Sequence, residues 1–139
     1  MISICLDTNA YSAHYKADPV AVALVAAVAQ IWLPAIVLGE LRAGFLNGSK
    51  SAANELHLQA FLGLPYLAVA NVTEVTSRHF AKISQQLRRD GRPIAANDIW
   101  IAATAMEHGI PLFTYDQHFR NVIGLQVVRN EEDWLRLHA

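Results

Sequence analysis

The chain has 139 residues, of which 53% are hydrophobic and 17% are charged. This length and composition suit one packed domain over residues 1–139 and exclude an intrinsically disordered chain. The 11 basic residues nearly balance the 12 acidic ones, so a phosphate-binding surface would have to come from local clustering of basic residues.

Apolar runs and helix caps alternate along the chain, which predicts strands alternating with helices. The first strand is Ile2 to Leu6, a short uncharged run typical of a strand buried on both faces, and Asp7-Thr8-Asn9 provides turn or capping residues after it. Further strands are expected at 31–33, 66–70, 112–114 and 125–128, and helices at 19–29, after Pro34, and at 52–62, 73–90, 97–109 and after Asn130. This order predicts an α/β fold with a parallel sheet of about five strands covered on both faces.

The segment from Val20 to Gly39 has no charged residue and is about as long as a membrane span. Asp18-Pro19 is typical of a helix start, and Gln30 and Pro34 interrupt the run, so a buried helix followed by a buried strand explains it better. The N-terminus lacks the basic flank and long apolar stretch of a secretory signal. The single cysteine, Cys5, cannot form an internal disulfide. We therefore expect a cytoplasmic protein without a membrane span.

Four acidic residues stand where such sheets bind ligands, beyond the carboxyl ends of the strands. Asp7 and Asp116 follow the first and fourth expected strands, while Glu40 and Asp98 are expected in the first turns of helices that enter from the same edge. Taken singly, each could be an ordinary cap, turn or solvated helix residue. Together, four carboxylates at close range repel one another, so they take up protons or bind a cation. An oxygen-only ligand set favours Mg²⁺ or Mn²⁺ over Zn²⁺.

Four motifs, in this order, resemble those of PIN domains: Leu-Asp-Thr-Asn at 6–9, Gly-Glu-Leu-x-x-Gly at 39–44, Asn-Asp-x-x-Ile-Ala-Ala-Thr-Ala at 97–105 and Thr-x-Asp-x-x-Phe at 114–119. The length is also similar to that of VapC-type toxins of type II toxin–antitoxin systems. The resemblance implies a three-layer α/β/α PIN-like fold and a bacterial, Mg²⁺- or Mn²⁺-dependent endoribonuclease that cuts single-stranded or structured RNA. It implies that Asp7, Glu40, Asp98 and Asp116 hold the metal, with support by hydrogen bonding from Thr8, Asn9 and Thr114.

RNA binding to an acidic pocket requires basic residues near its rim, because the carboxylates repel phosphate groups. The expected helix at 73–90 and the residues just after it carry a local excess of three positive charges, and three more basic residues lie close in sequence to the acidic motifs. A solvated helix face is the competing interpretation. The candidates for RNA binding are Arg78, Lys82, Arg88, Arg89, Arg92, Lys16, Arg42 and Arg120.

The resemblance also implies partners. Proteins that this chain resembles form homodimers and are inhibited by a small VapB-like antitoxin that blocks the acidic pocket. Some of them assemble with the antitoxin on operator DNA, and the resemblance implies the same for this chain. Other function classes fit less well. A receiver-like module would need an adjacent acidic pair near the first strand, and a haloacid-dehalogenase-like phosphatase would need Asp-x-Asp where this chain has Asp7-Thr8-Asn9. A PIN-like scaffold without catalysis would be expected to lack one of the four acids.

Overall fold

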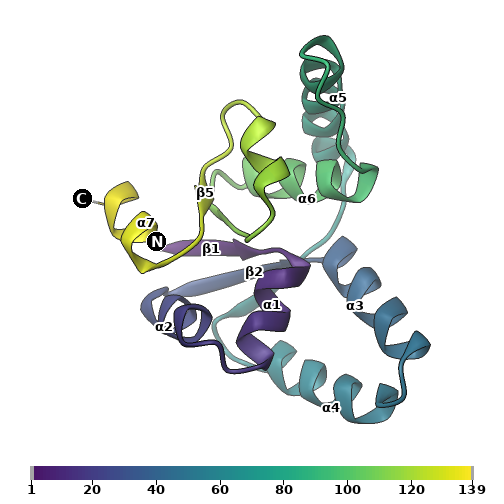
Figure 1. Ribbon diagram of the computed structural model, residues 1–139, viewed down its shortest axis with the longest axis vertical. Helices are drawn as coiled ribbons and strands as arrows, with labels where there is room; N and C mark the ends of the chain where they lie inside the picture. The colour runs from purple at the N-terminus through teal and green to yellow at the C-terminus, as the bar shows by residue number, and fades with distance from the viewer. Residues whose placement is uncertain (1, 139) are drawn as a thin grey trace.

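The computed structural model describes residues 2–138 as a parallel sheet of five strands with helices on both of its faces (Figure 1). The strands are β1 (Ser3–Leu6), β2 (Gln30–Pro34), β3 (Leu67–Ala70), β4 (Leu112–Phe113) and β5 (Val127–Val128), in the spatial order β3-β2-β1-β4-β5. Every neighbouring pair is parallel. The expected α/β class and five-stranded sheet are thus confirmed.

The central strand β1 is buried along its whole length, as its uncharged sequence predicts for a strand with helices on both sides. It pairs with β2 from Ser3 opposite Gln30, and with β4 from Cys5 opposite Leu112. The chain builds the sheet from β1 toward β3 on one side and then crosses to add β4 and β5 on the other. The order therefore reverses between β1 and β4, and ligands of open α/β sheets bind at such a switch point.

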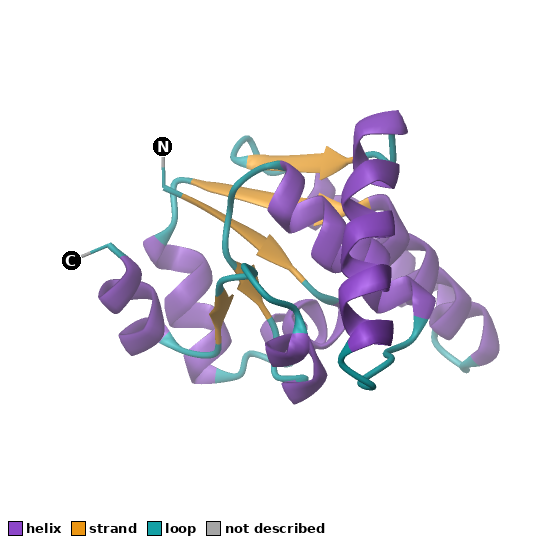
Figure 2. Cartoon of the chain, turned by 90° about the horizontal axis from the view of Figure 1, so that it is seen from above, coloured by secondary structure: helices purple, strands orange, loops and turns teal. Residues whose placement is uncertain are grey.

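The helices form the two outer layers. They are α1 (Thr8–Tyr15), α2 (Pro19–Ala27), α3 (Ala35–Asn47), α4 (Ser51–Leu62), α5 (Glu74–Arg89), α6 (Ala96–Glu107) and α7 (Glu131–Leu137), with a short 3₁₀ helix η1 (Gln117–Asn121). In Figure 1, α5 and α6 lie above the sheet and α1, α2 and α4 lie below it, and Figure 2 shows the strands flanked by helices from a second direction. The three-layer arrangement expected from the sequence is confirmed.

Two elements were not expected from the sequence, α1 and η1. Residues 8–15 include Thr8, Asn9 and Ser12, which are poor helix formers. The sequence predicts turn or capping residues at 7–9 and no helix after them. The segment is helical because Asp7 caps its first turn and because Ala10 and Tyr11 are buried against the core. Tyr11 packs edge-on against Phe61 of α4, with ring centroids 5.2 Å apart. Tertiary packing therefore outweighs weak local propensity.

The long uncharged segment has the structure expected of it. Val20 to Gly39 forms most of α2, all of β2 and the start of α3, and α2 buries Ala21, Leu24 and Val25. Within residues 2–138, no helix is long and apolar enough to cross a membrane. Cys5 is fully buried in β1, and this burial raises the pKa of its thiol, which suits a structural rather than a reactive cysteine.

Candidate active site

Asp7 lies at the centre of the candidate site, directly after β1 and as the N-cap of α1. One carboxylate oxygen accepts from the backbone N–H of Thr8 at 2.6 Å, and the other accepts from the hydroxyl of Thr114 at 2.7 Å. The side chain is almost fully buried, and this desolvation is the main reason why the pKa of Asp7 is raised. The two hydrogen bonds lower the pKa, and the negative charges of Glu40 and Asp116 raise it further. A carboxylate held by two donors despite this burial has a fixed orientation.

Glu40 is joined to Asp7 through Thr8. The hydroxyl of Thr8 donates to Glu40 at 2.7 Å while its backbone N–H donates to Asp7, so one residue at the start of α1 holds both carboxylates. Glu40 is the sixth residue of α3, which begins at Ala35. The expectation that it lies in the first turn of its helix is therefore wrong by one turn, because the helix already begins five residues earlier.

The loop after β4 brings the next acid, Asp116. The hydroxyl of Thr114 accepts from the backbone N–H of Asp116 at 3.0 Å while donating to Asp7. Asn9 accepts from the backbone N–H of Tyr115 at 3.1 Å, so it supports the loop rather than a carboxylate. Phe119, three residues after Asp116, is the fully buried residue of η1 and fixes this short helix to the core. The loop is thus tied to α1 at two points.

Asp98 completes the group from the first turn of α6, as expected. Burial, followed by the charges of Asp7, Asp116 and Glu40, raises its pKa to about 6, while His118 acts in the opposite direction. His118 itself lies 3.0 Å from the carboxylate of Asp116. A carboxyl group with such a pKa marks the place where a cation would relieve most repulsion.

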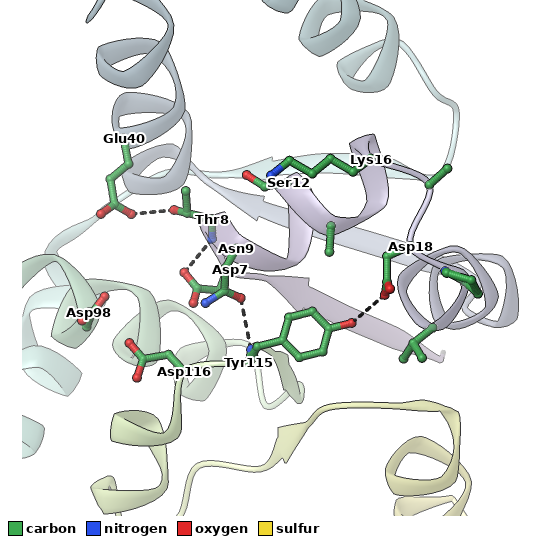
Figure 3. A pocket seen from close by; sticks show the side chains of 14 residues that line it. Asp7, Thr8, Asn9, Ser12, Lys16, Asp18, Glu40, Asp98, Tyr115 and Asp116 are labelled. Atoms are coloured by element: carbon green, nitrogen blue, oxygen red, sulfur yellow. Dashed lines mark hydrogen bonds between the residues drawn. The ribbon is translucent and has the colours of Figure 1, made fainter. Parts of the chain in front are cut away.

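All four acids line one open cavity of about 990 Å³ (Figure 3). The cavity also contains side chains that sequence reasoning did not select, among them Ser12, Asp18 and Tyr115. The hydroxyl of Tyr115 donates to Asp18 at 3.1 Å, and burial, followed by this hydrogen bond, raises the pKa of Tyr115 to about 12. The position of Tyr115 inside the Thr-x-Asp motif was the available signal. Ser12 and Asp18 were missed because α1 was not expected.

The carboxylates do not yet form a closed metal cage. Among residues 2–138, no three Asp, Glu, His or Cys side chains are gathered closely enough to surround one ion as they stand. Three of the acids accept from local donors instead: Asp7 from Thr8 and Thr114, Glu40 from Thr8, and Asp116 from the backbone N–H of His118. The negative charge and the oxygen ligands of the four carboxylates fit a hard divalent cation. The side chains would have to rotate to surround one ion.

The basic candidates separate into two groups. Among the described residues, Lys16 is the one basic side chain on the cavity wall. Arg42 is paired with Glu55 of α4 at 3.0 Å, and Arg78 with Glu74 at 2.8 Å on exposed α5. The remaining candidates do not line the cavity. Lys82, Arg88 and Arg120 are exposed, Arg89 lies 3.9 Å from Asp90, and Arg92 donates to Asn121 at 3.2 Å. Of the eight candidates, the structure therefore brings Lys16 to the acids.

Comparison with known proteins agrees with this geometry. The family model described as PIN domain matches residues 4–125. The chain is similar to the VapC ribonuclease Y4jK of Sinorhizobium fredii, with 33% identity over 134 residues that cover 90% of this chain and 95% of the relative. It is also similar to Toxin FitB of Neisseria gonorrhoeae, with 34% identity, covering 81% of this chain and 87% of the relative.

Solved structures give the same result. VapBC-5 from Mycobacterium tuberculosis, a member of the VapBC family of toxin–antitoxin systems, superimposes with a TM-score of 0.75 and 25% identity, covering 93% of this chain and 99% of that chain. FitAB bound to an IR36 DNA fragment superimposes with a TM-score of 0.71 and 28% identity, covering 94% and 95%. The four motifs, the sheet order and these matches agree, and the chain belongs to the PIN-domain family, in its VapC branch.

Proposed function

We infer that this chain, as a single PIN domain, is a metal-dependent endoribonuclease and the toxin of a toxin–antitoxin pair. The observation that carries the inference is the convergence of Asp7, Glu40, Asp98 and Asp116 on one cavity beyond the ends of β1 and β4. Membership of the VapC branch, with a relative named as a ribonuclease over nearly the full length, supports the same function. Hydrolysis of a phosphodiester in RNA is the reaction that this combination favours.

The four acids would hold Mg²⁺ or Mn²⁺. A divalent cation bound there supplies Lewis-acid stabilisation of the negative charge that develops on phosphate oxygens during hydrolysis. The chain's own contribution is to fix the carboxylates. Thr8 and Thr114 orient Asp7, and Thr8 also holds Glu40. Asp98, with its pKa of about 6, is the group best suited to hold a proton when no cation is present.

RNA would reach the cavity along its rim. Lys16 is the basic residue placed to contact a phosphate group next to the acids. The basic side chains of α5 and the loop after it would extend the contact to more distant phosphates, because long-range attraction to RNA depends on charge rather than on defined pairs. Arg42 is a weaker candidate, since Glu55 already neutralises it.

The expected partners follow from the VapC branch. A cognate VapB-like antitoxin would inhibit the enzyme by covering the acidic cavity, two copies of the chain would pair as a homodimer, and the complex would assemble on operator DNA. The VapBC-5 and FitAB structures support the pairing with an antitoxin, and the DNA fragment in the FitAB structure supports the assembly on DNA. We place the protein in the bacterial cytoplasm, where its RNA substrates are made.

Cleavage of a mixed cellular RNA pool by the purified chain tests the function. We expect cutting with Mg²⁺ or Mn²⁺ that stops with EDTA and is lost in Asp7→Asn. The matched control is Asp90→Asn, which changes an exposed acid at the end of α5 that does not line the cavity. Cutting that survives in Asp7→Asn as well as in Asp90→Asn would come from a contaminant and would overturn the assignment.

A further inference from the structure

The cavity extends well beyond the acids. Its volume of about 990 Å³ lies at the upper end of the range for small-molecule sites, roughly 300–1,000 Å³, whereas ions need far less. The part away from the carboxylate cluster is walled by α1, the loop after it and the first residues of α2. We call this part the Tyr115 compartment; it is lined by Ser12, Ala13, Lys16, Ala17, Asp18, Pro19, Val20 and Tyr115.

Tyr115 lies between the two parts of the cavity and is held from several sides. In Figure 3 its ring spans from the Asp7 and Asn9 side chains to Asp18. Its hydroxyl donates to Asp18 at 3.1 Å, and its backbone N–H donates to Asn9 at 3.1 Å. Phe113 packs against the ring edge-on, with centroids 5.4 Å apart and planes at 76°. The ring is therefore a rigid aromatic surface beside the carboxylates.

The surroundings of the ring have the chemistry of a nucleotide site. Ala13, Pro19 and Val20 give the compartment an apolar lining, and Lys16 adds a positive charge on the same wall. One oxygen of Asp18 already accepts from both Tyr115 and the backbone N–H of Ala21, so this carboxylate is held by the protein, and Lys16 on the same wall offsets its charge. Aromatic rings next to basic side chains bind single-stranded nucleic acid by stacking on bases and contacting the backbone.

We propose that the Tyr115 compartment is a subsite for the nucleotide adjacent to the cleaved phosphate, whose base stacks on the Tyr115 ring while Lys16 contacts a flanking phosphate. The proposal rests on the proposed ribonuclease function, since RNA in the acidic part of the cavity would place its neighbouring nucleotide in the compartment. Stacking is tolerant of base identity. The site thus selects unpaired nucleotides, whose bases are free to leave a helix.

Stacking is tested with short single-stranded RNAs that carry the fluorescent base 2-aminopurine at successive positions. Quenching of this base by the ring and fluorescence anisotropy are followed in Mg²⁺ on the full chain with Asp98→Asn, a substitution that the proposed function expects to block cleavage. Tyr115→Phe keeps the ring and loses the hydrogen bond to Asp18, whereas Tyr115→Leu loses the ring. We expect quenching at one position, retained in Tyr115→Phe, and binding weaker by about tenfold to a hundredfold in Tyr115→Leu.

The control for a lost tyrosine is Tyr66→Leu, which changes a tyrosine outside the cavity that is 39% exposed. Its binding should equal that of the parent chain. Circular dichroism and thermal unfolding establish that each variant is folded. Two outcomes overturn the proposal. If Tyr115→Phe and Tyr115→Leu both bind RNA as tightly as the parent chain, the ring does not stack on a base. If both variants lose the same affinity, the hydrogen bond from the hydroxyl to Asp18 matters and the ring does not.

The phosphate contact is tested through salt dependence. Lys16→Gln should lower the slope of log Kd against log salt concentration by about one relative to the parent. Lys50→Gln, at an exposed position before α4, is the matched control and should leave the slope unchanged. Equal slopes in both variants would remove Lys16 from the subsite.

The two levels of the proposal fail in different ways. If the chain is no ribonuclease, wild type does not cut RNA in Mg²⁺ or Mn²⁺, whatever the 2-aminopurine readout shows. If the ribonuclease function holds and the subsite does not exist, wild type cuts RNA while Tyr115→Leu binds like Tyr115→Phe. Either result rejects the subsite, and the cleavage assay tells which of the two has failed.

Discussion

Thr114 allows the support of the acidic cavity to be tested quantitatively, because one fully buried hydroxyl has two partners. It donates to Asp7 at 2.7 Å and accepts from the N–H of Asp116 at 3.0 Å. Thr114→Val keeps the shape of the side chain and removes the hydroxyl. A carboxylate with almost no access to water then loses a donor, and a part-buried N–H loses its acceptor.

The expected loss can be estimated from these two contacts. A hydrogen bond to a charged group contributes about 1.5–3 kcal/mol, and an unsatisfied buried donor costs about 1–3 kcal/mol. Since the N–H of Asp116 is only part-buried, the lower end applies to it. We expect Thr114→Val to reduce the free energy of unfolding at neutral pH by about 3 kcal/mol.

Urea denaturation with linear extrapolation measures this difference. The matched control is Thr104→Val, because Thr104 is equally buried and its hydroxyl donates to the carbonyl of Trp100 within α6, at 2.8 Å. Such a bond back to a helical carbonyl adds little, so the control should lose about 1 kcal/mol or less. Equal losses in the two variants would refute the idea that Thr114 supports the acidic site.

Three further outcomes follow from the same geometry. Asp98→Asn should stabilise the metal-free protein by about 1 kcal/mol above pH 6, a value discounted because the carboxyl is half-exposed. Because the pKa of Asp98 is raised to about 6, the folded wild type binds more protons than the unfolded chain between about pH 4 and 6. The wild type therefore loses stability as the pH rises through that range. If Asp98→Asn were still more stable than wild type in urea titrations below pH 4, this reasoning would be contradicted. Millimolar Mg²⁺ or Mn²⁺ should raise the Tm of wild type more than that of Asp98→Asn, whereas equal shifts would indicate unspecific ion binding. Arg42→Gln should weaken RNA binding in anisotropy titrations less than Lys16→Gln does, because Glu55 already pairs with Arg42; the reverse order would show that the ion pair opens to RNA.

The fold was accessible from sequence because its strong signals are local. An uncharged β-branched run followed by an aspartate predicted β1 and its end at Asp7, and Gly91, with a φ of 67°, ends α5 where a left-handed residue is needed. The helix α1 was not accessible, because its stability comes from the contacts of Tyr11 with α4 rather than from its own residues. Long-range packing of this kind leaves no periodic pattern in the sequence.

The candidate site shows the same division. The four acids could be placed at one edge because the ends of parallel strands meet there, and the structure brings them to one cavity. What could not be foreseen is which donor each of them faces. Asn9 binds the loop at Tyr115 instead of a carboxylate, and Arg42 turns to Glu55, since both choices depend on distances between segments far apart in the chain. The Tyr115 compartment follows from such a juxtaposition as well.

The central claim is that the cavity lined by the four acids is a metal centre. Calorimetric titration of the purified chain with Mn²⁺, in parallel on wild type and on Asp98→Asn, tests it most directly. The account predicts saturable binding to wild type that is strongly weakened in Asp98→Asn and unchanged in the control Asp90→Asn. Absence of binding to folded wild type, or equal binding to wild type and Asp98→Asn, would contradict it.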